Sequence, residues 1–292
     1  MRIVVGFDGS EGARDALEWA AGAARALELP LHVLSAWKQP SDAVVAIDPG
    51  TRPSPEEAQR LVEVGLLAAV DEVIRDEPLE ASTEVVRGSA VRALLEAAAD
   101  ATMVVVGSRG LGGFQGLLVG SVSRQLCEYA PCPITVLHRV GDRPVRLRTV
   151  VVGVDGSEDA QLALEFVADL VTRTGAELVV ANATGPQDPP EPAAGRPAVD
   201  LATRREWVEE WCAPLREAGI AYHVAVLRGD PRTAVLDAAR DRAADLIVVG
   251  SRGRGRIATL LLGSVATALA QQGTIPVTIV PHARRGDMVP LT

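Results

Sequence analysis

Two glycine-rich segments are the parts of this chain whose residue types and spacing could bind a ligand. The first, GSRGLGGFQGLLVGSVS, covers residues 107–123, and the second, GSRGRGRIATLLLGSV, covers residues 250–265. Each has a glycine, a second glycine three residues later, nine further residues and then a Gly-Ser pair. Each also follows an apolar run, at residues 103–106 and 246–249, that predicts a buried strand. Because the same spacing occurs twice in the same context, we infer that the spacing matters.

The chemistry that this pattern favours is anion binding. Glycine lets the main chain approach a ligand closely. The first segment leads into residues 124–129, which we predict to be a short helix. Unpaired N–H groups at a helix start, together with the helix dipole, attract negative charge. Ser121 and Ser123 can add hydroxyl donors, so we expect a phosphate group here.

The elements that must position these segments are strands alternating with helices. Hydrophobic periodicity predicts strands at residues 3–7, 31–36, 83–86, 103–106 and 133–137, and helices at 11–27, 55–75, 88–99 and 124–129. Such an order implies an α/β fold with a mainly parallel sheet and helices on both faces. Ligands of such sheets bind beyond the carboxyl ends of the strands. Asp8 and the first glycine segment both fall at such ends, so we expect them to converge on one pocket.

The whole pattern then occurs a second time. The sequence VVVGVDGS at residues 150–157 repeats IVVGFDGS at residues 3–10, and residues 178–183 and 275–280 match the second and fifth strands. We therefore predict a duplication, with domain 1 at residues 1–140, domain 2 at residues 147–283 and a linker between them. We also predict that the two fifth strands, at 133–137 and 275–280, pair edge to edge, because an uncovered apolar edge strand invites aggregation.

Composition excludes several classes of protein. The chain has 292 residues, a net charge of −9 and only 3% aromatic residues. It therefore lacks the basic surface and the stacking platforms that nucleic-acid binding requires. Its three cysteines form no C-x-x-C pair, and no run approaches the roughly 18 apolar residues of a membrane span. A strand begins at once after Met1, which leaves no room for a signal peptide. We expect a cytoplasmic protein with neither nucleic acid nor membrane as a partner.

Each candidate also has a plainer structural interpretation. The glycine segments could be tight connections without a ligand, and Asp8 and Asp155 could be turn carboxylates beside the helix caps Ser10 and Ser157. The histidines lack metal-ligand spacing, and the tryptophans and cysteines are expected to pack in the core. The chain contains no Walker A motif, no kinase motif set and no supported Ser/His/Asp order.

These motifs resemble those of the universal stress protein family in its tandem two-domain form, over nearly the whole chain. The resemblance lies mainly in a nucleotide-binding signature, supported by Asp8 and Asp155. The signature is Gly107, Gly110, Gly120 and Ser121 in the first half, and Gly250, Gly253, Gly263 and Ser264 in the second. The resemblance implies two tandem Rossmann-like domains of the adenine nucleotide alpha hydrolase-like kind. Each would have a five-stranded, mostly parallel sheet in the order 3-2-1-4-5, would bind one ATP, and would pair through its last strand.

The resemblance also implies which residues would contact ATP. Asp8 and Asp155 would meet the adenosine, with Gly6 and Gly153 leaving space, and the backbone near Ala36 and Ala183 would bond the adenine edge. The residues implied around ribose and phosphates in the first half are Gly107, Ser108, Arg109, Gly110, Leu111, Gly112, Gly113, Gly120, Ser121, Val122 and Ser123. Those implied in the second half are Gly250, Ser251, Arg252, Gly253, Arg254, Gly255, Arg256, Gly263, Ser264 and Val265.

The two predicted sites differ in two ways. Ser123 corresponds to Ala266, so the second site lacks one hydroxyl, worth about 0.5–1.5 kcal/mol as a hydrogen bond. Against this, Arg254 and Arg256 have no charged counterpart in the first segment and could meet phosphate. We expect both sites to bind ATP, with affinities that need not be equal.

The resulting functional hypothesis is an ATP-binding regulatory protein of the stress response, with slow or absent hydrolysis and no assigned catalytic residue. We expect a homodimer and an unidentified regulatory protein partner. One alternative is an enzyme that hydrolyses ATP or transfers its phosphate, with Mg²⁺ held by Asp8 or Asp155. Another is an interaction scaffold whose pockets stay empty. The sequence does not rank ATP over ADP or AMP.

Overall fold

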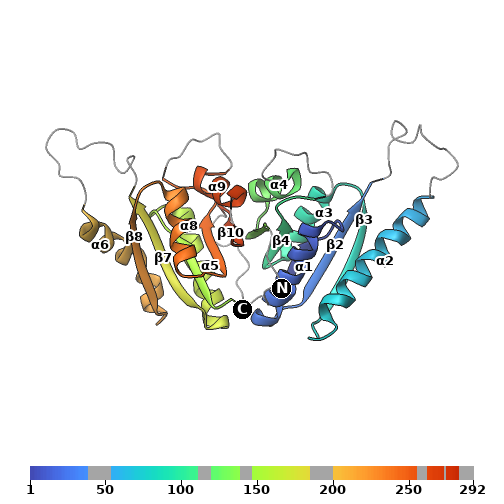
Figure 1. Cartoon of the computed structure of the whole chain (residues 1–292), viewed down its shortest axis with the longest axis horizontal. Helices are drawn as coiled ribbons and strands as arrows, with labels where there is room; N and C mark the ends of the chain where they lie inside the picture. The colour runs from blue at the N-terminus through green and yellow to red at the C-terminus, as the bar shows by residue number, and fades with distance from the viewer. Residues whose placement is uncertain are drawn as a thin grey trace.

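The structure is a computed structural model that describes residues 1–38, 54–110, 120–138, 147–184, 200–254, 262–272 and 274–282. Figure 1 shows two lobes spreading from a central junction, with the first half of the chain on one side and the second half on the other. Strands and helices alternate in both lobes, as the sequence predicted.

The two halves contain the same succession of strands and α-helices, apart from one extra helix in the second half, and a 3-10 turn at Ala98–Asp100 follows α3 in the first half. Those of the first half are β1 Ile3–Gly6, α1 Glu11–Leu27, β2 Leu31–Trp37, α2 Pro55–Ile74, β3 Ala81–Arg87, α3 Ala90–Ala97, β4 Met103–Gly107, α4 Ser121–Tyr129 and β5 Ile134–Leu137. Those of the second half are β6 Thr149–Gly153, α5 Glu158–Thr174, β7 Glu177–Thr184, α6 Leu201–Trp211, α7 Ala213–Glu217, β8 Tyr222–Arg228, α8 Pro231–Asp241, β9 Leu246–Gly250, α9 Ser264–Gln272 and β10 Val277–Val280.

The strands form one ten-stranded sheet in the order β3-β2-β1-β4-β5-β10-β9-β6-β7-β8. Within each half the neighbouring strands are parallel and follow the predicted order 3-2-1-4-5. The predicted α/β fold is therefore confirmed. The predicted boundaries near residues 140 and 147 adjoin a segment outside the described residues, and they stay a prediction.

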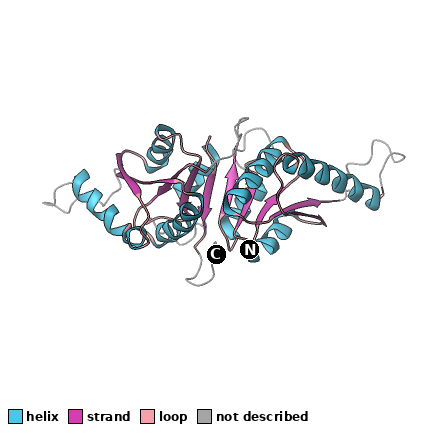
Figure 2. Ribbon diagram, turned by 90° about the horizontal axis from the view of Figure 1, so that it is seen from below, coloured by secondary structure: helices cyan, strands magenta, loops and turns pink. Residues whose placement is uncertain are grey.

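The central strands form because they are runs of β-branched residues that are buried on both faces, as a parallel sheet requires. Val4, Val5, Val104 and Val105 are all 0% exposed. Helices cover both faces of the sheet (Figure 2). One core, which includes Leu17 of α1 and Leu164 of α5, lies on one face, and a second, which includes Leu94 of α3 and Val235 of α8, lies on the other. Both cores draw residues from both halves, so the halves share their interior.

The two halves meet where β5 pairs with β10, which confirms the predicted edge-to-edge pairing of the fifth strands. The pairing is antiparallel, with Thr135 opposite Thr278 at its centre. Their side-chain oxygens lie 2.8 Å apart, and both residues are fully buried. On a face of the sheet, Arg173 of α5 also donates to the Leu27 carbonyl at the end of α1, over 2.8 Å. Such a cation satisfies an orphan carbonyl at a helix C-terminus.

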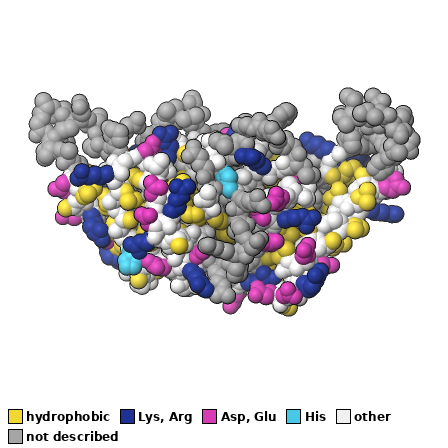
Figure 3. Space-filling model, viewed as in Figure 1, with side chains coloured by type: hydrophobic (Ala, Val, Ile, Leu, Met, Phe, Trp, Pro, Cys, Tyr) yellow, Lys and Arg dark blue, Asp and Glu magenta, His cyan; other side chains and the backbone are white. Residues whose placement is uncertain are grey.

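Two surface features complete the description. None of the helices in the described part of the chain is long and apolar enough to cross a membrane. Helix α2 exposes apolar side chains on its outer side, namely Leu61, Val64 and Leu67, which are 69%, 66% and 49% exposed. Figure 3 shows hydrophobic side chains gathered on the lobe that contains α2.

The threonine pair at the junction gives a first prediction. In Thr135→Val the Thr278 hydroxyl stays buried without its partner, which we expect to destabilise the protein by about 1–3 kcal/mol. Thr278→Val should cost less, because the Thr135 hydroxyl also lies 3.8 Å from the sulfur of Met103. Urea unfolding of the two single variants and the double variant measures these effects.

The double variant tests whether the two hydroxyls act as a pair. Because it leaves neither hydroxyl unsatisfied, it should be less destabilised than the sum of the single variants. Strictly additive free energies would show that the two oxygens do not interact.

Candidate functional site

A cavity lies at the carboxyl ends of the parallel strands in each half. In the first half it lies beside the ends of β1 and β4, and in the second half beside the ends of β6 and β9. In each half these are the two strands between which the strand order reverses. A doubly wound sheet opens a crevice at this position. The cavities measure about 490 Å³ in the first half and about 650 Å³ in the second, which is within the range of small-molecule sites.

The first cavity has an apolar end and a polar end. Leu34 and Ala36 of β2, with Leu94 of α3, line the apolar end. Gly107, Arg109 and the start of α4 line the polar end. Helix α4 begins at Ser121, three residues earlier than predicted, with Gly120 as a cap that has no side chain to satisfy the first N–H groups. These N–H groups and the single arginine make this end suitable for an anion.

The second cavity repeats this plan with more polar walls. Asn182 of β7 and Arg204 of α6 line it, although both are almost completely buried. Arg204 Nε donates to Asn182 Oδ1 over 2.8 Å, and Asn182 Nδ2 donates to the Val154 carbonyl over 2.7 Å. At the mouth, Arg232 donates to the carboxylate of Asp230, which lowers the pKa of that carboxyl to about 2.

The aspartates at the ends of β1 and β6 hold the turn that follows each strand. Asp8 Oδ1 accepts from the Ser10 N–H over 3.0 Å, and Asp155 Oδ1 accepts from the Ser157 N–H over 2.9 Å. In the second half, Asp155 Oδ2 also accepts from the Arg254 N–H over 2.9 Å. Asp155 therefore ties the β6–α5 turn to the loop after β9, and it lines the cavity while doing so. Asp8 and Asp155 are therefore turn carboxylates, as in the plainer interpretation. This role is compatible with a contact to a ligand.

The signature glycines have a packing role that sequence reasoning missed. A Cβ on Gly107 would lie 2.7 Å from the Gly12 carbonyl oxygen, and one on Gly250 would lie 2.6 Å from the Asp159 carbonyl oxygen. At both places the end of a strand crosses the first turn of the helix α1 or α5 at backbone contact distance. The sequence pattern assigns these glycines to the close approach of a phosphate. In the structure, the close packing of the strand end on the helix already requires a residue without a side chain.

Three serines of the two segments, Ser108, Ser123 and Ser251, form hydrogen bonds within the protein. The carbonyl oxygens of Ser108 and Ser251 accept from the N–H groups of Gly120 and Gly263, over 2.6 and 2.7 Å, and so close the base of each loop. The Ser123 hydroxyl donates to the Gly107 carbonyl over 2.8 Å. This hydroxyl was expected to face a phosphate, but in the structure it ties the start of α4 to the end of β4.

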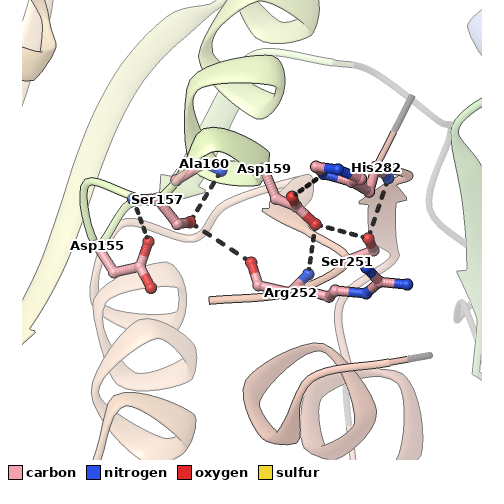
Figure 4. Close-up of polar contacts among 7 residues, drawn as sticks. All are labelled: Asp155, Ser157, Asp159, Ala160, Ser251, Arg252 and His282. Atoms are coloured by element: carbon pink, nitrogen blue, oxygen red, sulfur yellow. Dashed lines mark hydrogen bonds and ion pairs between the residues drawn. The ribbon is translucent and has the colours of Figure 1, made fainter. Parts of the chain in front are cut away.

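A buried carboxylate anchors the second loop (Figure 4). Asp159 Oδ2 accepts from the Ser251 hydroxyl and from the Arg252 N–H, each over 2.8 Å, and Asp159 Oδ1 lies 2.6 Å from His282 Nδ1. The aspartate lies between the serine and the histidine, whereas a nucleophilic triad places the histidine in the middle. We therefore interpret this cluster as structural. Gly12 holds the equivalent position in the first half.

Most of the predicted contact residues surround the two cavities. The first is lined by Gly6, Asp8, Ala36, Gly107, Arg109, Gly110, Gly120, Ser121, Val122 and Ser123, whereas Ser108 does not line it. The second is lined by Gly153, Asp155, Ala183, Gly250, Ser251, Arg252, Gly253, Arg254, Gly263, Ser264 and Val265. Leu111, Gly112, Gly113, Gly255 and Arg256 lie outside the described residues. What the lining residues bind stays a prediction.

Sequence reasoning missed the residues that come from elements far from the signature. Leu94 and Val235 look like ordinary core residues of a helix, so nothing in the sequence marked them. Asn182 could have been noticed, because it is a polar residue inside the otherwise apolar strand β7. Arg204 carried no such signal.

The other reactive side chains do not form a second site in the described part of the chain. No group of three His, Cys, Asp or Glu residues there could hold a metal ion. Cys127, Cys132 and Cys212 are buried and unpaired, and burial raises the pKa of each thiol to about 12. These thiols are therefore protonated and unreactive at neutral pH.

The fold and the cavities define a class, namely a tandem doubly wound α/β protein with one switch-point pocket in each half. The model of the universal stress protein family matches residues 1–138 and again residues 146–281. The chain therefore belongs to the universal stress protein family.

Individual relatives agree with this assignment. The chain is 33% identical over 290 residues to universal stress protein Rv2623 of Mycobacterium tuberculosis, covering 95% of each chain. It is 33% identical over 309 residues to universal stress protein Rv1996 of the same organism, covering 95% of this chain and 94% of the relative. A crystal structure of a universal stress protein from Archaeoglobus fulgidus shares the fold, with a TM-score of 0.74, 23% identity and coverage of 97% and 98%.

The packing role of the glycines gives a second prediction. We expect Gly107→Ala and Gly250→Ala each to lower the free energy of unfolding by about 1–3 kcal/mol, because the added methyl group meets main-chain atoms that cannot rotate away. Chemical denaturation without any ligand measures this effect.

Gly65→Ala is the matched control. Gly65 lies in helix α2, and a Cβ there would meet nothing within 4 Å. The same substitution should leave the stability unchanged or raise it by about 0.5–1 kcal/mol. Wild-type stability in Gly107→Ala and Gly250→Ala would show that the strand ends do not need these glycines.

Proposed function

We propose that each of the two pockets binds one adenine nucleotide, ATP in particular, and that the protein acts as a regulatory protein of the stress response. The observation that carries this proposal is the division of each cavity into an apolar end and an anion-binding end. A nucleotide has the matching parts, a flat base and a phosphate tail. The choice of adenine rests on the family resemblance described above.

The apolar end supports the placement of the base. In the first pocket, Leu34, Ala36 and Leu94 offer a surface against which a planar ring can pack. In the second pocket, Ala181, Ala183 and Val235 take the equivalent positions. This placement would bring the edge of the base within reach of the strand-end backbone beside Ala36 and Ala183, which is the contact that the family resemblance implies.

The polar end supports the placement of the phosphates. The starts of α4 and α9, at Ser121 and Ser264, line the cavities together with the neighbouring glycines. A helix N-terminus with an uncapped first turn attracts negative charge. Arg109 in the first pocket and Arg252 in the second add a positive charge at the same place.

We propose binding and signalling rather than turnover as the main activity. An ATP-hydrolysing enzyme would need a carboxylate that holds Mg²⁺ or activates water. In the second half both oxygens of Asp155 already accept main-chain N–H groups. The Ser251, Asp159 and His282 cluster has the wrong order for nucleophilic catalysis.

The proposed assembly is a homodimer that presents its nucleotide state to a regulatory protein. Sedimentation equilibrium with and without ATP measures the oligomeric state, and a monomer under both conditions would contradict the homodimer.

A matched pair of pocket-filling variants tests nucleotide binding. Ala36→Phe places a ring in the apolar end of the first pocket, and Ala183→Phe does the same in the second. Each variant should bind one ATP per chain by isothermal titration calorimetry, whereas the wild type should bind two. The filled pocket should lose affinity about a hundredfold and so leave the range of the titration, since overpacking can cost about 3 kcal/mol.

Thermal unfolding without ligand controls for damage to the fold. Both variants should unfold cooperatively near the wild-type temperature. A wild-type protein that is folded but binds no adenine nucleotide would contradict the proposal, as would variants that both retain two sites.

A further inference from the structure

The two pockets differ most in charge at their phosphate ends. Residues 107–123 contain one arginine and no other charged residue, whereas residues 250–266 contain three arginines and no other charged residue. Among the described lining residues, Arg109 is the one arginine in the wall of the first pocket. The second pocket has Arg252 at the equivalent position and Arg254 in addition. Its wall also contains Arg204, which donates to Asn182, and Arg232, which is paired with Asp230. Leu111 holds the position that is equivalent to Arg254.

The Arg254 side chain is held in place by an aromatic ring. Its guanidinium carbon lies 4.9 Å from the centre of the Trp211 ring, at the end of α6. Its backbone N–H donates to Asp155. An arginine that stacks by its face keeps its N–H groups in the plane, where they can donate to phosphate oxygens. Arg254 therefore combines a fixed position with donor groups at the rim of the pocket.

The turn after the first strand of each half shows the same difference. A Cβ on Gly156 would lie 2.5 Å from Trp211 and 2.6 Å from the Arg254 guanidinium, whereas one on Gly9 would meet nothing within 4 Å. In the second half, tryptophan and arginine thus close over the turn beside the pocket. In the first half this place is open among the described residues. Helix α2, which corresponds to α6, contains no tryptophan.

Three negative groups near the second pocket have to be considered in this comparison. Asp155 lines the wall as Asp8 lines the wall of the first pocket, and its two oxygens accept the Ser157 and Arg254 N–H groups. Asp230 also lines the wall, and it is paired with Arg232. The Asp159 carboxylate lies behind the loop and is not part of the cavity wall. It accepts from the Ser251 hydroxyl, the Arg252 N–H and His282, so its charge is matched by its own donors. It therefore does not offset Arg254 at the mouth of the pocket.

From these contacts we infer that the two pockets select nucleotides by phosphate number, the second favouring a di- or triphosphate over a monophosphate and the first discriminating little. Arg254 is the residue that determines this selectivity. This inference rests on the proposed function, because it assumes that both pockets bind a nucleotide. A longer phosphate tail carries more negative charge to the rim, where Arg254 can form charge-assisted hydrogen bonds with it.

The experiment measures the affinities of AMP, ADP and ATP for one pocket at a time. Ala36→Phe leaves the second pocket open and Ala183→Phe leaves the first, and titration calorimetry in the presence of EDTA prevents Mg²⁺ from neutralising the phosphates. We expect the second pocket to bind ATP about tenfold more tightly than AMP, which is the effect of one charge-assisted hydrogen bond. The first pocket should show a ratio of about threefold or less.

Arg254→Leu in the Ala36→Phe background identifies the responsible side chain. It introduces the residue type found at the equivalent position of the first half, and it should lower the ATP:AMP affinity ratio of the second pocket to that of the first. Arg240→Leu is the matched control, because it removes one positive charge from the exposed face of α8, where Arg240 pairs with Asp237. The ratio in this control should stay at that of the parent variant.

The outcomes separate this inference from the proposed function. Equal ATP:AMP ratios in the two pockets, or an unchanged ratio in Arg254→Leu, would overturn the inference while leaving nucleotide binding intact. Absence of any nucleotide binding in the folded variants would overturn both.

Discussion

The structure depends on a main-chain contact at the end of the fourth strand of each half. There the chain leaves β4 or β9 and crosses the first turn of α1 or α5 so closely that no side chain fits. This contact fixes where the following loop starts, and a hydrogen bond between the two ends of that loop fixes where α4 or α9 begins. The helix starts are therefore aimed at the crevice between the strand ends. The anion-binding character of the pocket is thus a consequence of backbone packing.

The fold could be predicted from the sequence because the patterns that indicate it lie within short stretches of the chain. Buried parallel strands are continuous apolar runs, and the repeat of IVVGFDGS as VVVGVDGS revealed the duplication directly. The edge pairing of β5 with β10 could be predicted because both strands are apolar and would otherwise be uncovered. The start of α4 was placed three residues too late, because glycine as a cap leaves no polar side chain to mark a helix start.

The site could be predicted from the sequence only in part, because much of it is formed by contacts between segments that are distant in the chain. The glycine spacing marked the loop, but it could not show that Gly107 packs against Gly12. It also could not show that the Ser123 hydroxyl bonds a main-chain carbonyl. Arg204 of helix α6 lines the second pocket, and Trp211 of the same helix contacts Arg254, which also lines it. The sequences of α6 and α2 share no pattern that would have indicated this. Only the three-dimensional arrangement brings these residues close to the pocket.

The two halves show how a duplicated pocket can diverge without loss of its frame. The strand order, the turn aspartates and the loop closures are the same in both. The second half differs from the first in its buried Asp159 anchor, its Asn182–Arg204 pair and its Arg254–Trp211 stack. These features lie around the second pocket and leave the sheet unchanged. The two halves therefore share one sheet topology but differ in the residues around their pockets.

The central claim is that each half of one chain holds one adenine nucleotide. Native mass spectrometry of the intact protein with excess ATP tests it most directly, because it counts ligands per chain without an assumption about affinity. The account predicts a species with two bound ATP molecules as the limit of the titration. A protein that remains folded and ligand-free at saturating ATP would contradict it.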